Sequence, residues 1–477
     1  MKKQTNSSSV SGEKPFKLDY KRTFIIGFAF FGILLLWQVY DSWCPTFLTE
    51  LFKEALGASK TEDVQYLVGI MMALDNVAAL IMLPIFGHLS DKTHTKIGKR
   101  MPYILIGTFV CAVAFPFIPV FFHYHQVGGT IAMMAIVVFF AMMYRNPAVS
   151  LMPDITPKPL RSKANGIINI MGYIGGAFAT VVGIIFVLSN YLGKDSVNWL
   201  NNNANIWIIE APFLVASVLM VISALVLAFL INENKIEEEV KPEMDRGEKV
   251  AAVEDAIIED KPLSKANKIM LILILAAEFF WFMADNGIGT FMGNYTLYYL
   301  KCKTSSNMIN TIVGGLGSVI GFAVGGIIAG KIGRKWTIAG GLVLALLSVA
   351  TWLILGYAIP VATPGESGYN SFPVYLYVIW GLKGFGMSLV HINSFPMVVE
   401  LSSRKTVGRF TGYYYASSMA AQTITPCLLG LFLLSPSFGF EFLPLYASAC
   451  LIISLAIFLF VKNIKKKLVN NDVKEVK

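Results

Sequence analysis

Charged residues are scarce in this chain. They make up 14% of its 477 residues, and hydrophobic residues make up 55%. Soluble proteins carry about 25% charged residues. The mean hydropathy of the chain is +0.61. This composition excludes an ordinary soluble domain and indicates an integral membrane protein whose main surroundings are a lipid bilayer.

Cysteine and histidine are also few, at five residues each. The cysteines are scattered, with no CxxC pair and no cysteine–histidine cluster, so we predict neither a metal site nor a disulfide framework. The sequence has no Ser/His/Asp order typical of nucleophilic catalysis and no phosphate-binding loop. We therefore expect a protein that is not an enzyme and needs no cofactor.

Long hydrophobic segments fill most of the chain. A helix that crosses a bilayer needs about 20 apolar residues, and twelve segments of that kind fall into two sets of six. The sequence therefore predicts an all-α membrane fold. The first set lies at about 22–43, 64–87, 101–122, 129–152, 164–189 and 206–231, and the second at about 268–298, 308–330, 336–359, 373–399, 410–434 and 441–461.

These segments divide the chain into two bundles of six helices, at 22–231 and 268–461. Short polar tails precede and follow them, at 1–21 and 462–477. The linker at 232–267 is rich in glutamate and lysine and is too polar to enter lipid. Its composition predicts a solvated tether with at most one amphipathic turn.

Lysine and arginine gather on one side of the predicted membrane. The two termini and the loops after even-numbered spans hold 32 of the 39 cations, whereas the opposite loops hold five. Loops rich in these residues face the cytoplasm, so both termini are predicted to be cytoplasmic. This distribution explains the net charge of +9 without a nucleic-acid partner. We expect a monomer in the plasma membrane.

Two predicted spans half a chain apart carry the pattern Trp-x-x-x-Asp, as Trp37 with Asp41 and as Trp281 with Asp285. Residues four apart share a helix face. Placing a charged side chain near the bilayer centre costs a few kcal/mol. Such a side chain therefore normally faces the protein interior or a watery cavity. Six helices per half is an even number, so the halves share one orientation and form a parallel pseudo-repeat. Substrate sites in such folds lie between the repeats, near the bilayer midplane.

The loop after the second span reads Gly87-His88-Leu89-Ser90-Asp91-Lys92 and then Gly98-Lys99-Arg100-Met101-Pro102. This loop resembles the signature of the major facilitator superfamily, Gly-x-Leu-x-Asp-x-x-Gly-Arg-Lys. Its Gly-Lys-Arg-x-Pro ending is similar to the glycoside–pentoside–hexuronide and sucrose–proton symporter branch. The resemblance implies two pseudo-symmetric six-helix bundles and secondary transport by alternating access.

An acid and a basic cluster at a cytoplasmic mouth can form an ion pair that exists in one conformation only. The second half has a decayed copy of the loop with Gly330 in the acid's place, so we expect no mirrored ion pair there. For the charges that follow the fourth and tenth spans, a gate and a solvated surface remain equal alternatives. The predicted gate comprises Gly87, Asp91, Lys99, Arg100, Asp154, Arg161, Glu400 and Arg409.

In the superfamily, spans 1, 4, 7 and 10 line the central cavity. The resemblance therefore implies that the polar residues inside these spans bind the substrate, a glycoside or other sugar. Indole rings can stack on sugar faces, although contact with lipid is the alternative for a membrane tryptophan. The predicted substrate residues are Trp37, Asp41, Arg145, Asn146, Trp281, Asp285, Asn286 and His391, and Lys383 is a further cation in the tenth span.

The buried acids are candidates for coupling transport to a cation: Asp41, Asp75, Glu278 and Asp285. The melibiose-type branch holds sodium with two acids on its second span, and the matching positions here are Ala79 and Leu83. We therefore expect protons, with sodium as the alternative. Two other hypotheses remain open, which are transport or export of a non-sugar solute, and a receptor or scaffold that binds a ligand without moving it.

Overall fold

The computed structural model describes residues 16–193, 204–256, 265–359, 361, 371–401, 407–435 and 438–462. Within these residues every regular element is a helix, so the prediction of an all-α fold is confirmed. Eleven helices of the described part are long and apolar enough to cross a membrane. The tenth predicted span, α14 (Val374–Leu401), is long enough, but it carries Lys383, His391 and Glu400 and is not among the eleven.

The first half contains six predicted spans, the third of which is interrupted at Phe115 and Pro116 between α3 and α4. Two short 3₁₀ turns, η1 (Glu62–Val64) and η2 (Lys158–Leu160), and the short α7 (Leu188–Leu192) connect them. The helices are α1 (Tyr20–Leu56), α2 (Gln65–Lys92), α3 (Met101–Ala114), α4 (Phe117–His123), α5 (Val127–Asp154), α6 (Arg161–Ile185) and α9 (Trp207–Leu230).

The second half repeats this arrangement, and a π-helical turn, η3 (Tyr295–Tyr299), extends its first helix. Each half has a separate hydrophobic core of its own. Its helices are α11 (Lys265–Asn294), α12 (Thr304–Ile332), α13 (Arg334–Ala358), α14, α15 (Val407–Leu434) and α16 (Phe442–Leu459).

The halves meet along two equivalent pairs of helices, α2 with α15 and α6 with α12. Since α2 and α12 are the second spans of their halves and α6 and α15 the fifth, one pairing occurs twice, as the pseudo-repeat requires. Glycine allows the close approach. A Cβ atom on Gly69 would lie 2.0 Å from the Pro426 carbonyl oxygen, and one on Gly430 would lie 2.7 Å from that of Gln65.

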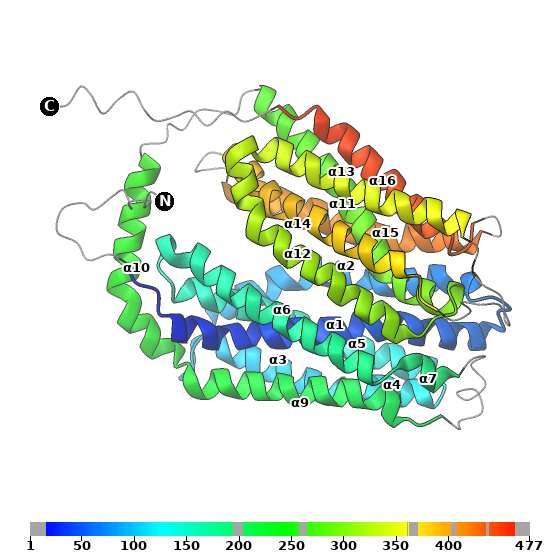
Figure 1. Cartoon of the computed structure of the whole chain (residues 1–477). Helices are drawn as coiled ribbons and strands as arrows, with labels where there is room; N and C mark the ends of the chain where they lie inside the picture. Colours follow the sequence, from blue (N-terminus) through cyan, green and yellow to red (C-terminus); the bar gives the residue numbers. More distant parts are fainter. Residues whose placement is uncertain are drawn as a thin grey trace.

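The linker differs from the predicted tether, because residues Glu233–Ala256 form a helix, α10. The Asn232 side chain accepts a hydrogen bond from the Lys235 N–H at 3.1 Å and so caps the start of this helix. Figure 1 shows α10 in green, steeply inclined to the bundle helices and near the start of α1. An ion pair of 3.3 Å between Arg22 and Glu239 fixes that position.

Candidate functional site

One cluster of charges lies inside the first half. Asp41 on α1 is exposed, although its neighbours Tyr40 and Trp43 are buried. Its carboxylate interacts electrostatically with the guanidinium of Arg145 on α5 and with Asp75 on α2. The Tyr40 hydroxyl donates to Asp75 at 3.3 Å. Three spans therefore bring two acids and one fixed cation together.

A second cluster lies inside the other half. Lys383 on α14 donates to Asp285 on α11 across 2.5 Å, and their side chains are 14% and 36% exposed. The imidazole of His391 interacts electrostatically with the same carboxylate. The ring of Phe282 packs 5.3 Å from that of His391. Both partners of the ion pair lie within membrane spans, where pairing offsets the cost of burying a charge.

The two clusters have the same design. In each half an acid on the first span faces a cation on the fourth, Asp41 with Arg145 and Asp285 with Lys383. At the offset of 246 residues between the halves, Arg145 aligns with His391 in the sequence, yet the cation that pairs with Asp285 is Lys383. The signal was present, since Arg145 and Lys383 are the two cations that fall inside the predicted spans and not at their ends.

The repeated tryptophans occupy different surroundings. Trp37 is half-buried and packs edge-on against Tyr40 at 5.6 Å. Trp281 is fully buried inside the second half, where its ring lies 6.5 Å from that of Phe458 on α16. This burial argues against the predicted stacking of a substrate on Trp281, because the indole faces its own bundle.

Two predicted asparagines also differ. Asn146 donates to the Leu83 carbonyl at 2.6 Å, so it ties α5 to α2 rather than reaching into a cavity. Asn286, next to Asp285, has a buried side-chain oxygen without a protein hydrogen-bond partner among the described residues. It remains a substrate candidate, whereas the role of Asn146 is structural.

Uncharged polar side chains join the halves at the end remote from the linker. We call Thr46, Thr49, Gln65 and Asn294 the amide cluster; all four are buried. Asn294 on α11 accepts from Thr46 at 2.9 Å and donates to Thr49 at 2.9 Å and to Gln65 at 3.0 Å. Nearby, the Tyr298 hydroxyl donates to Glu50 at 2.6 Å. These bonds cross from one half to the other and hold this end closed.

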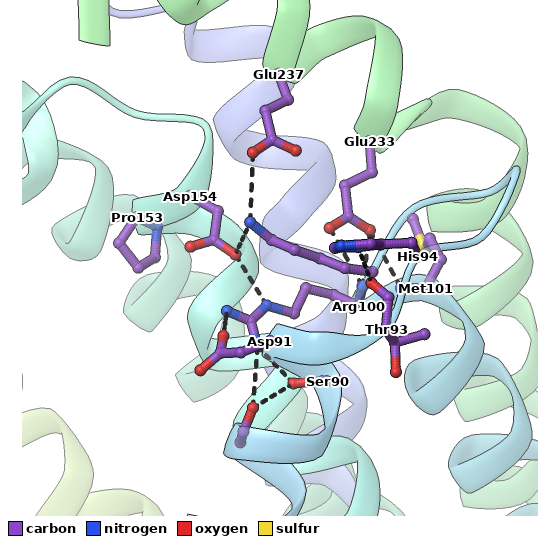
Figure 2. A network of polar contacts seen from close by, with 12 residues as sticks. Ser90, Asp91, Thr93, His94, Arg100, Met101, Pro153, Asp154, Glu233 and Glu237 are labelled. Carbon is purple, nitrogen blue, oxygen red and sulfur yellow. Dashed lines mark hydrogen bonds and ion pairs between the residues drawn. The ribbon is translucent and has the colours of Figure 1, made fainter. Parts of the chain in front are cut away.

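Charged side chains dominate the opposite end, where α10 lies (Figure 2). The Arg100 guanidinium contacts Asp91 and Ser90, and its Nε donates to Asp154 at 2.8 Å. Lys99 bridges Asp154 and Glu237, each at 3.4 Å. We call these residues, together with Glu233, the arginine network. All of them belong to the first half and the linker.

The linker completes the network through Glu233. Its buried carboxylate accepts the backbone N–H groups of Arg100 at 2.9 Å and Met101 at 3.3 Å, at the start of α3. An acid at a helix N-terminus is favourable because it faces the positive end of the helix dipole. Burial raises the pKa of Glu233, and the backbone donors oppose that rise only in part. Gly87 contributes its carbonyl oxygen to Arg100 at 3.4 Å.

The remaining gate predictions have other partners. Arg161 donates to the carbonyl groups of Pro153 at 2.8 Å and Thr156 at 3.0 Å instead of pairing with Asp154. Glu400 pairs with Arg334 at 2.9 Å, and Arg409 is exposed. The second half therefore has a counterpart of the Arg100–Asp154 pair in Arg334 and Glu400, whereas Gly330 stands at the position of Asp91.

The family model described as Major Facilitator Superfamily matches residues 23–363 and 303–476, which overlap and cover nearly the whole sequence. No curated protein matches this chain.

Several solved structures have a fold similar to that of this chain. A POT family transporter in complex with 5-aminolevulinic acid is 13% identical, with a TM-score of 0.64 over 94% of this chain and 98% of that one. A bacterial homologue of the iron transporter ferroportin, inward-facing, is 12% identical, with a TM-score of 0.62 over 93% and 99%. The inward-open xylose transporter XylE from E. coli is 15% identical, with a TM-score of 0.59 over 94% and 97%. Identities of this size establish the fold alone.

Proposed function

Because this chain belongs to the Major Facilitator Superfamily and is a membrane transporter, we propose that it is a proton-coupled symporter of a glycoside or disaccharide. The observation that carries the proposal is the pair of matched clusters, Asp41 with Arg145 and Asp285 with Lys383. Each half offers a hydrogen-bond acceptor and a donor from its first and fourth spans. Carboxylates accept from sugar hydroxyls, and the cations donate to them.

The way the halves are joined supports a mechanism of alternating access. The amide cluster crosses between the halves at one end, whereas the arginine network stays within the first half and the linker. With both termini in the cytoplasm of a plasma-membrane protein, as the basic loops favour, the closed end is extracellular. The conformation is then inward-facing, and the amide cluster opens when the halves rock the other way.

Uptake into proteoliposomes tests this function. Labelled sucrose and melibiose are supplied separately, with a pH gradient, a sodium gradient or no gradient. We expect a pH gradient to drive accumulation, and Asp41→Asn and Asp285→Asn each to abolish it, because each removes the charge of one matched cluster. Glu238→Gln is the control, since Glu238 is exposed on α10. Accumulation driven by sodium alone would contradict proton coupling.

A zwitterionic solute is the second candidate, favoured by the presence of both charge signs in both clusters. Its carboxylate would pair with Arg145 or Lys383, and its ammonium with Asp41 or Asp285. The same vesicles decide between the candidates when labelled dialanine is supplied. Uptake of dialanine with no uptake of either disaccharide would replace the sugar by a zwitterion and leave the transport mechanism intact.

A further inference from the structure

Glu278 is a buried acid that neither matched cluster uses. It lies on α11 with 0% exposure, and neither of its carboxyl oxygens has a protein hydrogen-bond partner among the described residues. The indole N–H of Trp281, one turn along the same helix, is likewise buried without a partner. Most buried polar groups have hydrogen-bond partners, so these exceptions need an explanation.

Among the described residues, no cation lies beside Glu278. Tyr414 on α15 is the titratable group that faces it, and the Tyr414 hydroxyl lies 2.8 Å from Ser394 on α14. Lys383 on α14 is engaged by Asp285, seven residues or about 10 Å farther along α11 at 1.5 Å per residue.

In the part of the chain that the structure describes, the other helices packed on α11 add no charge beside Glu278. The titratable residues of α16 are Tyr446 and Cys450, which contact each other. The Tyr446 hydroxyl lies 3.5 Å from the Thr425 hydroxyl. The single titratable residue of α12 is Lys331, at the end of that helix. The hydrogen bond from α1 reaches α11 at Asn294, sixteen residues beyond Glu278.

An isolated carboxylate in such a place is very unfavourable. Burying an ionised group without a partner costs several kcal/mol in a protein interior. The group therefore takes up a proton and becomes neutral. In the present packing of α11 against α15 and α16, Glu278 is therefore a neutral carboxylic acid. Ionisation requires that these helices separate enough to admit water or a cation.

We propose that Glu278 is the proton-binding site of the transport cycle, separate from the acids of the matched clusters, and that its protonation permits the conformation seen here. The proposal rests on the proposed function and assigns its proton. The carboxylate takes one proton from solvent on one side and returns it on the other, and no other bond changes. One helix then links the proton at Glu278, the substrate acid at Asp285 and the closed end at Asn294.

Infrared spectroscopy tests the proton directly, without any substrate. Purified protein in lipid nanodiscs is measured at neutral pH, and the spectrum of Glu278→Gln is subtracted from that of the wild type. A protonated carboxyl has a C=O stretching band that a carboxylate lacks, and we expect the difference to contain this band. Asp285→Asn is the matched control and should not remove it, because Lys383 keeps Asp285 ionised.

A difference spectrum without the band would overturn the proposal, as would a band that disappears when sodium replaces choline in the buffer. If the glutamine variant does not fold, Glu278→Leu is used in thermal unfolding as a function of pH. The wild type should lose stability as the pH rises above about 4.3, the ordinary pKa of a glutamate in an unfolded chain, because the unfolded state releases a proton that the folded state keeps. The leucine variant should lack that loss. Equal pH dependence of the two proteins would overturn the proposal.

Transport then separates this assignment from the proposed function. Glu278→Gln should lose pH-driven accumulation of the disaccharide and retain exchange of labelled for unlabelled disaccharide across the membrane. Loss of both activities in a folded variant would contradict a role limited to the proton. Failure of the wild type to carry either disaccharide would refute the sugar while leaving the infrared result valid.

Discussion

The two ends of the molecule are held by different chemistry. The arginine network consists of charges that stay within the first half and the linker, whereas the amide cluster consists of uncharged groups that cross between the halves. Removing one partner of a buried charge pair is costly because the other charge is left unpaired. Neutral amides and hydroxyls exchange protein partners for water at a net cost of only about 0.5–1.5 kcal/mol per bond.

This difference fits the demands of alternating access. Contacts that must break in every cycle need a total free energy of a few kcal/mol, since a ligand shifts an equilibrium only by its differential affinity for the two states. The hydrogen bonds of the amide cluster together contribute a free energy of that magnitude. The arginine network instead joins the first half to α10, as Figure 2 shows.

The largest effect is expected for Arg100→Ala. The Arg100 side chain is 5% exposed and contacts two carboxylates, so its loss should lower the free energy of unfolding by about 3–5 kcal/mol. Arg334→Ala is the matched control in the second half, where the partners are 35% and 30% exposed and the loss should be at most about 1 kcal/mol. Thermal unfolding in detergent measures both. Equal losses would show that the two ion pairs contribute equally to the free energy of unfolding.

The next effect is expected for Asn294→Leu, which keeps the size of the side chain and removes three hydrogen bonds of the amide cluster. Each hydrogen bond contributes about 0.5–1.5 kcal/mol net. The conformation with this end closed should therefore lose about 2–4 kcal/mol of stability relative to the conformation with it open. Distances between spin labels at Lys60 and Lys303, exposed residues of the two halves, should lengthen.

Ser348→Ala is the control, because its hydroxyl bonds to the Leu344 carbonyl within α13 and joins no halves. It should leave the distance between the labels unchanged. A distance that is equally unchanged in Asn294→Leu would mean that apolar packing, and not the amide cluster, keeps this end closed.

The sequence predicted the features that depend on composition. Polar groups are costly in lipid, and this cost makes three features recognisable in the sequence. They are the apolar segments, the division into halves, and the two acids Asp41 and Asp285. What it did not predict depends on packing and on contacts distant in the sequence. Trp281 repeats Trp37 in sequence, yet it is fully buried whereas Trp37 is half-buried. Lys383 lies eight residues before His391, the position that the repeat aligned with Arg145.

The ends of the spans were harder still to predict. Threonine, glutamine and asparagine near a helix end are common and give no signal, so the amide cluster was not anticipated. The polar linker was interpreted as a tether because composition alone does not reveal that Glu233 caps α3. That contact spans more than 130 residues of sequence, and it exists only once the first half has folded.

A smaller effect is expected for Gly98→Ala, which tests whether the linker helix is fitted to the first half. Gly98 has φ +111°, and a Cβ atom there would lie 2.1 Å from a Glu233 carboxylate oxygen. Backbone strain for an L-residue at positive φ costs roughly 1–2 kcal/mol, and the clash adds to it. A spin label at position 238 should become more mobile as α10 leaves its place.

Gly57→Ala is the matched control, because Gly57 has φ +60° with no atom within 4 Å of the added Cβ. It introduces strain at the end of α1 without touching α10. Increased label mobility in this variant as well would attribute the effect to general destabilisation and not to the contact with Glu233.

The smallest effect concerns Lys99 and pH. Burial lowers the pKa of Lys99, but the carboxylates of Asp154 and Glu237 raise it by a larger amount. The pKa of Lys99 is therefore raised above its ordinary value of 10.5. The proton is thus held more tightly when α10 is attached, and the contribution of Lys99 to that attachment is complete at neutral pH and lost as the pH rises above 10.5. For a partly exposed pair this contribution is about 0.2–1 kcal/mol. The label at position 238 should therefore become slightly more mobile at high pH in the wild type and not in Lys99→Arg, whose guanidinium stays charged; the same rise in both proteins would assign the change to another group.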